Sequence, residues 1–496
     1  MSEKKIVILR NTFLFSASNY IAIFIGFFVS VLSKRILGIE GTGQWATLMI
    51  FLSYGLIVGN FGIEIAITRE IPQAKGRGEH QEVDEMINVG FTSSIIIGVA
   101  ISLVYILVGR FWIKDPIIAN GLLVTTALFV ITLLYNLNLS ILRAKKFISA
   151  LSKITVINVI LVGFFSLLLA YFYGVIGYLI GTILSTLCSF FISSRIGLMQ
   201  YKWCLNVKKT VKLIIIGLPM LIAGLIQNTF LGLDKIIIAS MLGVPALGLY
   251  SIALMATQQL TSLPRFFQTV LFPYVQEDYG RSRSLDELRP YFIKAMYIMS
   301  RLLPFVIGLV IFFIPAIVIY FLPKFKDGLF AMQVLVCGFY FVILSETNTM
   351  FIYTINKQRI LPLIYAILLA ISAGLNYFVV THGWGIAGVA LASSIAYLIL
   401  FMVESAYAYL HIMKMKEFII YLSKLIAVYI CVLLIIFFLN AVVVAENVLL
   451  QLILRTLLFC LFYSIILIRL EKKEALFSLF RRALSGYFKK EAIKRI

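Results

Sequence analysis

Long apolar runs separated by short polar segments fill most of the chain. Fourteen such runs can be traced, and most reach about 20 residues, the length that crosses the hydrocarbon core of a bilayer as a helix. Segments of about ten residues with alternating hydrophobicity, typical of a transmembrane barrel, are not seen. The pattern therefore predicts an all-α polytopic membrane protein with about 14 transmembrane helices. The predicted spans are 12–36, 42–66, 89–110, 116–142, 151–172, 174–194, 213–241, 245–264, 293–320, 329–355, 361–380, 385–410, 419–440 and 447–468.

Two short patterns occur once in each half of the chain. Leu37–Trp45 and Leu242–Tyr250 both read Leu-Gly, four residues, Gly, one residue, aromatic, and an offset of 205 aligns all four matching positions. Gly174–Gly177 precedes the sixth span, and Gly385–Gly388 precedes the twelfth. Taken singly, each glycine is explained by close helix packing in lipid. Their pairing predicts two parallel repeats related by an axis along the membrane normal.

The repeats define the predicted domain organisation. Two six-helix lobes are expected, followed by two additional transmembrane helices and a basic cytoplasmic tail. These segments are 1–212, 213–412, 413–468 and 469–496.

Two polar loops and the tail are the main segments predicted outside the membrane. Arg69–Asn88 and Glu277–Tyr291 occupy matching places in the two halves, and each is predicted to form a short amphipathic helix at the membrane surface. The tail is basic with an apolar stripe, which suits an anionic inner leaflet. A disordered basic tail fits the same residues, and both alternatives stay open.

The distribution of positive charge predicts how the chain is oriented in the membrane. The net charge is +21, but 61% of residues are hydrophobic and only 13% are charged, far from the composition of a soluble domain. With the N-terminus inside, 35 of the 43 Lys and Arg residues fall on the inner side and 6 on the outer side. This bias predicts cytoplasmic N- and C-termini, and it explains the basic charge without nucleic acid.

Residues for enzyme chemistry are sparse. The five Cys and three His are scattered without metal or disulfide spacing, and no P-loop is present. The predicted outer loops are short, whereas a polysaccharide polymerase or ligase would be expected to carry a large one. We therefore expect neither an enzyme nor a bound cofactor.

Ionisable residues within predicted spans are the candidate functional groups, because charge in the membrane is costly. Asp234 and Lys235 lie in the outer third of the seventh span, and Lys34 and Arg35 end the first span at the corresponding level. A cation cluster facing Asp234 fits this placement. Snorkelling of Lys34 and Arg35 to the outer headgroups fits equally well.

Five further ionisable residues lie within the predicted spans. Arg301 and Glu346 sit at matching depths on consecutive spans and are predicted to form a buried pair. Glu64, Glu404 and Arg455 lie closer to helix ends, where an interfacial position is favoured.

Several of these segments together resemble the flippase branch of the multidrug/oligosaccharidyl-lipid/polysaccharide (MOP) exporter superfamily. Within it, the likeness is to bacterial polysaccharide biosynthesis proteins, including O-antigen and capsule repeat-unit flippases. The resemblance covers roughly residues 5–410 in pattern, and the last two helices fit members with fourteen helices. It is carried by Arg35–Trp45, Asn60–Gly62 with Arg69, Lys75–Glu79 and Asp234–Lys235 before the second Leu-Gly pattern.

The resemblance implies a fold and a mechanism. The fold is MATE-like: two lobes form a V around a central cavity that is lined by helices one, two, seven and eight and opens alternately to either side. The substrate is an oligosaccharide joined by pyrophosphate to a polyprenyl lipid, which moves from the cytoplasmic to the outer leaflet for assembly of O-antigen, capsule or exopolysaccharide. A groove beside the last two helices would take the lipid tail.

The resemblance also assigns roles to the charged residues. Lys34, Arg35, Lys235 and Arg301 are the candidate cavity cations for pyrophosphate. The acids Glu64, Asp234 and Glu346 are candidates for coupling, with H+ or Na+ left open.

The expected setting follows from the same resemblance. It is the cytoplasmic membrane of a bacterium or archaeon, with membrane lipids, a polysaccharide polymerase and chain-length machinery as partners and no nucleic acid.

A cation-coupled multidrug or small-molecule antiporter is the main alternative. Drug exporters of the superfamily commonly carry an acid in the first helix, and this chain has none between Thr12 and Ser33, which disfavours the antiporter. The family often has an acidic residue where Asn60 stands, so that position carries no charge role here. A polymerase or ligase is the alternative from another class of protein.

Overall fold

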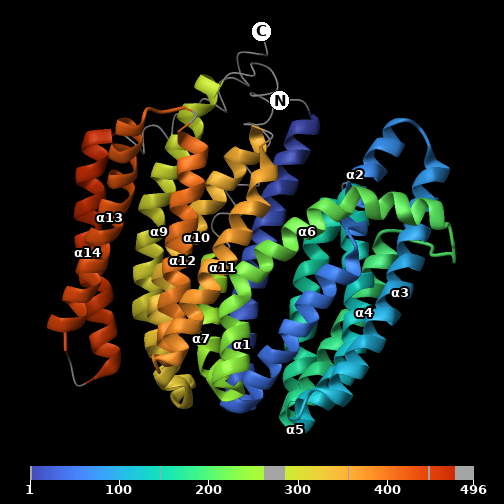
Figure 1. The fold of residues 1–496 in the computed structure, drawn as a ribbon, viewed down its shortest axis with the longest axis horizontal. Coiled ribbons are helices and arrows are strands. Elements are labelled where there is room, and N and C mark those ends of the chain that lie inside the picture. Colours follow the sequence, from blue (N-terminus) through green and yellow to red (C-terminus); the bar gives the residue numbers. More distant parts are fainter. Residues whose placement is uncertain are drawn as a thin grey trace. The chain divides into compact units, whose positions relative to one another are not determined.

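The protein is helical throughout the part of the chain that the computed structural model describes (Figure 1). That part comprises residues 3–145, 147–261, 285–355, 357–410, 412–444 and 447–474. The tail from 475 onward and most of the predicted interfacial segment 277–291 lie outside it.

The described helices follow one another in chain order. Their bounds are α1 Glu3–Asn60, α2 Ile63–Gly76, α3 His80–Phe111, α4 Pro116–Ala144, α5 Ile148–Ile196, α6 Val207–Ile237, the π-helix η1 Ile238–Leu242, α7 Val244–Leu260, α9 Leu285–Phe321, the 3-10 helix η2 Pro323–Gly328, α10 Leu329–Thr354, the 3-10 helix η3 Gln358–Ile360, α11 Leu361–Thr381, α12 Gly385–Tyr409, α13 Met415–Val442 and α14 Val448–Glu474.

Within the described residues, eleven helical stretches are long and apolar enough to cross a membrane, and they correspond to 13 of the 14 predicted spans. Two of them, in α1 and α5, each hold two predicted spans, because the backbone breaks at Gly38 in α1 and at Tyr173 and Gly174 in α5. The span at 245–264 corresponds to α7, which is 17 residues long.

The chain forms two compact units. Unit 1 consists of Met1–Arg10, Ala256–Ile364 and Ala390–Ile496, and unit 2 of Asn11–Met255 and Tyr365–Val389. The lobe boundaries expected at 212 and 412 stay predictions.

Helix α4 is the centre of the packing in unit 2, where it lies against α2, α3 and α5. It starts sharply because Asp115 caps it, accepting hydrogen bonds from the backbone N–H groups of Ile117 at 2.8 Å and Ile118 at 3.2 Å, with Pro116 at its first position. Leu122 and Phe129 on α4 are fully buried in the core of this unit.

The structure corrects the expectation of a surface helix over 69–88. Instead α2 runs to Gly76, a tight turn follows, and α3 begins at His80. Ile71 and Ala74 of α2 are fully buried in one core with Val83 and Met86 of α3, so the apolar side of this segment packs into the protein.

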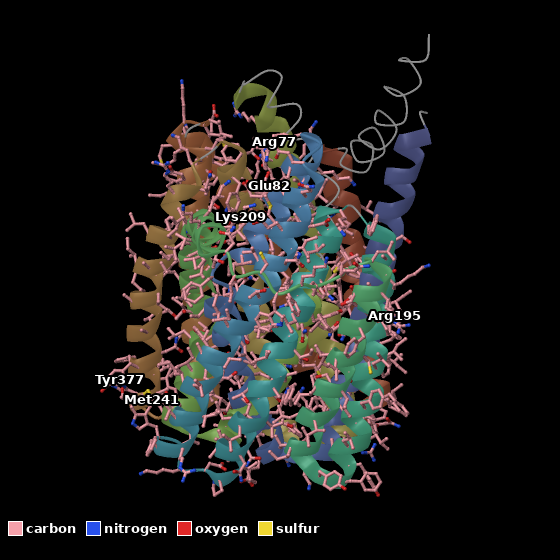
Figure 2. The ribbon with its side chains drawn as sticks, turned by 90° about the vertical axis from the view of Figure 1, so that its right-hand side faces the viewer. Arg77, Glu82, Arg195, Lys209, Met241 and Tyr377 are labelled. Atoms are coloured by element: carbon pink, nitrogen blue, oxygen red, sulfur yellow. The ribbon has the colours of Figure 1, made fainter. Side chains whose placement is uncertain are left out.

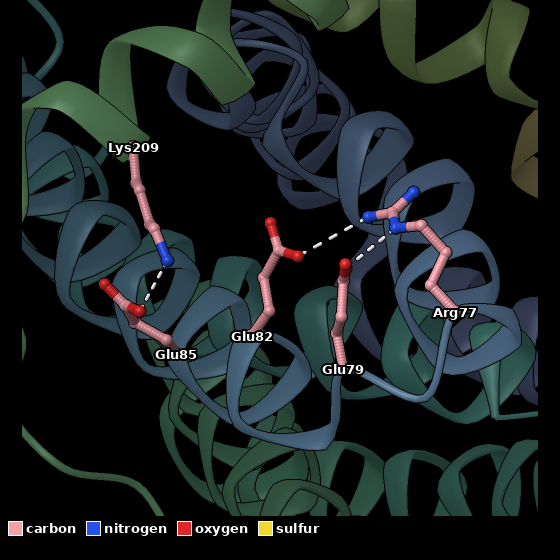
Figure 3. A network of polar contacts seen from close by, with 5 residues as sticks. All are labelled: Arg77, Glu79, Glu82, Glu85 and Lys209. Carbon is pink, nitrogen blue, oxygen red and sulfur yellow. Dashed lines mark hydrogen bonds and ion pairs between the residues drawn. The ribbon is translucent and has the colours of Figure 1, made fainter.

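Ion pairs hold the α2–α3 turn and the start of α6 (Figure 3). The Arg77 guanidinium lies 2.7 Å from the Glu79 carboxylate and 3.4 Å from that of Glu82, and Lys209 of α6 contacts Glu85 of α3 at 2.5 Å. Figure 2 shows Arg77, Glu82 and Lys209 at one end of unit 2, with Met241 and Tyr377 at the other.

Candidate functional site

The first glycine of each Leu-Gly pattern breaks the helix at the same place. Gly38 has φ 70° and ψ −171°, and Gly243 has φ 90° and ψ 172°, a backbone region that glycine alone adopts without strain. A Cβ atom on Gly38 would have no neighbour within 4 Å. The sequence-based reading of Gly38 as a close-packing position is therefore wrong, and its role is conformational.

The second glycine of each pattern makes the close contact. A Cβ on Gly43 would lie 2.0 Å from the carbonyl oxygen of Val244, and a Cβ on Gly248 would lie 2.0 Å from the carbonyl oxygen of Ile39. Since 39 and 244, like 43 and 248, differ by 205, the two contacts are copies of each other. We call this reciprocal contact of Ile39, Gly43, Val244 and Gly248 the glycine seam. Both pattern copies belong to unit 2.

The aromatic residue of each pattern anchors the seam differently. Tyr250 is fully buried and donates its hydroxyl hydrogen to Asp234 Oδ2 at 2.7 Å. Trp45 packs edge-on against Tyr178, with ring centroids 4.5 Å apart. The seam therefore has a polar anchor in its second copy and an aromatic anchor in its first.

The Asp234 carboxylate is hydrogen-bonded to residues of the second half of the chain. Its carboxylate is 2% exposed, and its Oδ1 atom accepts the backbone N–H of Lys235 at 2.8 Å. Within the described residues no ion pair joins Lys34 to Asp234. Asp234 thus ties the end of α6 to α7 through Tyr250.

The predicted cations of unit 2 differ in environment. Lys34 is buried, and its Nζ donates to Ser30 Oγ at 2.8 Å, one turn earlier on α1. Arg35 is exposed, and Lys235 is partly exposed. Lys34 therefore does not snorkel, whereas Arg35 is open to its surroundings.

Glu64 lies at the start of α2 among polar groups. Its backbone N–H is bonded to Asn60 Oδ1 at 2.9 Å, and its carboxylate accepts a long hydrogen bond of 3.5 Å from Ser140 on α4. It is partly buried at the α2–α4 contact.

Arg301 and Glu346 belong to unit 1, on α9 and α10. The Arg301 side chain is 5% exposed, and its guanidinium carbon lies 5.0 Å from the centre of the Tyr297 ring, a cation–π distance. The Arg301 carbonyl oxygen accepts a hydrogen bond from Tyr463 of α14. The structure thus places Arg301 where α9 packs against α14. The Arg301–Glu346 pair stays a prediction.

Glu404 is a buried acid that the sequence placed wrongly. It was expected near the membrane interface, but it is completely buried, and Thr349 Oγ1 donates to both of its carboxylate oxygens at 3.3 Å. The expectation failed because burial here comes from packing against α10, which sequence distance from the helix end does not reveal.

The comparison with known protein families decides the family. The sequence model of the family described as "Polysaccharide biosynthesis protein" matches residues 31–330. The chain belongs to this family. A search of curated proteins gave no match.

Solved structures share the fold at low sequence identity. The lipid II flippase MurJ, in an inward closed conformation, aligns with a TM-score of 0.73 and 17% identity over 92% of this chain and 99% of that chain. A multidrug resistance MATE family transporter of the MOP superfamily, in an inward-facing conformation, aligns with a TM-score of 0.63 and 16% identity over 80% and 99%.

A MOP superfamily transporter from Pyrococcus furiosus is also similar, with a TM-score of 0.56 and 16% identity over 79% of this chain and 95% of that chain. The MATE-like fold of a multi-pass membrane protein is thereby confirmed.

Proposed function

We propose that this chain is a flippase that carries polyprenyl-pyrophosphate-linked oligosaccharide units from the cytoplasmic to the outer leaflet. The units would serve the assembly of a surface polysaccharide such as O-antigen, capsule or exopolysaccharide. Membership of the polysaccharide biosynthesis family supports a substrate that contains sugar. The structurally similar MurJ is named as a flippase of a lipid, lipid II.

The glycine seam is the observation that carries the mechanism. Alternating access needs two repeats whose contact can open and close. In the seam, each repeat presents a glycine to the other repeat's backbone, so the contact involves van der Waals packing and no charged pair. Met241, next to the second pattern, lies at the end of unit 2 away from the basic α2–α3 turn (Figure 2). In the predicted orientation this is the outer side, so the seam is the closed outer gate.

The charged residues supply the proposed substrate contacts. Lys34, Arg35, Lys235 and Arg301 would attract the pyrophosphate, because cations bind phosphate oxygens through strong charge-assisted hydrogen bonds. Arg35 and Lys235 are the more accessible of the four. Glu64 and Glu346 are kept as proposed coupling acids for H+ or Na+. Asp234 accepts a hydrogen bond from Tyr250, the aromatic residue of the second pattern. A change in the charge of Asp234 would therefore alter this bond and act on the glycine seam.

The proposed setting is the cytoplasmic membrane, with both termini in the cytoplasm. A polysaccharide polymerase and chain-length machinery would act on the flipped unit, and the groove beside α13 and α14 would hold the lipid tail.

The test uses cells that lack this protein. Their lipids are extracted and weighed by mass spectrometry, and an impermeant sugar-modifying enzyme reports on spheroplasts which leaflet holds the sugar. Finished lipid-linked units confined to the inner side are expected, with normal distribution after the gene is restored. Units that reach the outer face normally and stay unpolymerised would contradict flipping. Normal lipid-linked units together with altered drug sensitivity would favour the antiporter.

A further inference from the structure

The segment that joins α5 to α6 is fastened to α3. Residues 199–206 form no helix, yet their backbone is held by side chains of α3. The backbone N–H of Lys202 donates to Asn88 Oδ1 at 2.9 Å. The backbone N–H of Cys204 donates to Thr92 Oγ1 at 3.1 Å. The connection therefore has a fixed course, and the side chains between these bonds are held in place.

The start of α6 packs against α2 and α3 with one of its sides. Leu213 is buried in a small core with Ala66 of α2 and Val89 of α3. The hydroxyls of Thr210 and Ser93 are hydrogen-bonded at 3.0 Å. Since positions 210 and 213 are three residues apart, they share one face of the helix. The opposite face of α6 points away from this contact.

Apolar side chains continue along the side that points away from α3. The members are all at least 47% exposed, and we call them the linker patch: Trp203, Leu205, Val207, Val211 and Ile215. The last three follow one another at intervals of four residues, so they form one stripe on α6. A contiguous exposed apolar surface of this kind marks a place where a membrane or a partner binds.

The linker patch lies at one end of the membrane-spanning part of unit 2. It comes before Gly217–Leu242, the stretch of this helix that is long and apolar enough to cross a membrane. Lys209, within the same segment, lies at the end of unit 2 that also holds Arg77 and Glu82 (Figure 2). Exposed tryptophan and amphipathic helices favour the boundary between lipid and water. The position of the linker patch therefore fits the surface of a bilayer.

Basic side chains border the linker patch. Lys202, Lys208 and Lys212 are exposed. On α6, Lys208 and Lys212 each follow a member of the stripe by one residue, so they flank it on one side. Lysine in this position can place its carbon chain on the apolar surface and its ammonium group at a headgroup. The surface thus combines an apolar centre with a positive border.

Two acids close to this segment are bound to cations. Glu79 contacts Arg77 at 2.7 Å, and Glu85 contacts Lys209 at 2.5 Å. Glu79 also interacts electrostatically with Lys212. These contacts balance the acids with Arg77 and Lys209, and the lysines that border the linker patch add positive charge beyond that balance.

We propose that the linker patch binds anionic phospholipids of the bilayer. The apolar side chains would lie among the acyl chains, and Lys202, Lys208 and Lys212 would contact the headgroup phosphates. Charge complementarity favours anionic over neutral lipids, because each lysine near the surface gains from a negative headgroup. The fixed course of the connection holds these groups in place for a lipid surface. Only the choice of the inner leaflet rests on the orientation in the proposed function.

Trp203 offers a direct reading of the lipids at the linker patch. Full-length protein is reconstituted in phosphatidylcholine vesicles with a fixed minor fraction of phosphatidylglycerol. Either this phosphatidylglycerol or an equal amount of phosphatidylcholine carries brominated acyl chains, which quench tryptophan fluorescence on contact. The Trp203 signal is the difference between the unaltered protein and Trp203→Phe, because the chain has 4 tryptophans. We expect quenching of Trp203 by the brominated anionic lipid to be about threefold stronger than by the neutral one.

The bordering lysines are expected to cause this preference. In the triple variant Lys202→Gln, Lys208→Gln and Lys212→Gln, both brominated lipids should still quench Trp203, but with a ratio of about one. High salt should lower the ratio of the unaltered protein in the same direction. The thermal unfolding midpoint checks that the variant is folded. If the triple variant does not fold, Lys208→Gln carries the test and should lower the ratio in part.

A matched control removes the same amount of charge elsewhere. It replaces three exposed lysines of unit 1 by glutamine, and these are Lys414, Lys416 and Lys424. The control should keep the threefold preference at Trp203, since its lysines do not border the linker patch.

Three results would overturn the proposal. Equal quenching by both lipids in the unaltered protein would mean that the linker patch meets the bilayer without selecting anionic lipid. Quenching by neither lipid would place Trp203 outside the membrane and leave the stripe to a protein partner. A preference that persists in the folded lysine variant would assign the selectivity to other residues. None of these readouts needs transport, so failure of flipping in cells would leave them untouched.

Discussion

Gly43 faces the backbone of Val244 so closely that a Cβ on this glycine would lie 2.0 Å from the Val244 carbonyl oxygen. The same distance separates a Cβ on Gly248 from the carbonyl oxygen of Ile39. The proposed gate would close only if both glycines lack side chains. It also leaves no charged groups to desolvate when it closes again.

Replacing either seam glycine is expected to hold the gate open. Gly43→Ala and Gly248→Ala each place a methyl group onto a carbonyl oxygen, and we expect a loss of about 1–3 kcal/mol for the closed state. Each variant should still reach the membrane, which the amount of folded protein there measures. It should lose most of its transport, which polymer output measures. Gly26→Ala is the control, because a Cβ there meets nothing within 4 Å. Equal activity of Gly43→Ala and Gly26→Ala would show that the seam does not have to close.

Gly38 is expected to be sensitive to backbone strain and insensitive to side-chain size. Any side chain at φ 70° and ψ −171° should cost about 1–3 kcal/mol, and the space beside Gly38 is open. Gly38→Ala and Gly38→Leu should therefore lower the thermal unfolding midpoint by similar amounts. A far larger loss for leucine would indicate close packing after all.

Asp234 and Tyr250 are expected to act as a pair. Asp234→Ala and Tyr250→Phe should each reduce stability and transport, and the double variant should lose less than the sum, because both changes remove the same 2.7 Å hydrogen bond. Asp234→Asn keeps one acceptor oxygen and is expected to reduce transport as well. Thermal midpoints of the four proteins in the cycle measure the coupling. Strictly additive losses would show that the bond contributes nothing of its own. Lys235→Ala should reduce transport by removing a cation and leave this coupling unchanged.

Arg301 and Glu346 are expected to depend on each other. If they form a structural pair, Arg301→Ala leaves a partly buried acid behind, and adding Glu346→Ala should restore part of the lost folded protein. The yield of folded single and double variants is the readout. Additive loss in the double variant argues against the pair.

The helices and the repeat could be predicted from the sequence because both depend on local patterns. Apolar runs give the spans directly, and the 205-residue offset gives the pairing of the Leu-Gly patterns. The offset does not say that the two copies touch. The contact of Gly43 with Val244 depends on how the helices pack, which the sequence pattern does not show.

The failed expectations share the same cause. Gly38 and Gly43 look alike in sequence, yet one serves the backbone turn and the other the contact, which only φ angles and neighbours distinguish. Glu404 lies near the end of α12, yet it is completely buried, with Thr349 of α10 against its carboxylate. The segment at 69–88 is amphipathic, but its apolar side meets α3 and α4 and not lipid.

The central claim is that the protein moves a lipid-linked oligosaccharide across the bilayer. The most direct measurement uses the purified protein in liposomes. These liposomes contain lipid-linked oligosaccharide that was extracted from cells without the protein. An impermeant sugar-modifying enzyme added outside then reports how much of the oligosaccharide becomes accessible. Proteoliposomes with the unaltered protein should expose nearly the whole pool, and those with Gly43→Ala should resemble empty liposomes. Equal accessibility in empty liposomes and in those with the unaltered protein would contradict the flippase.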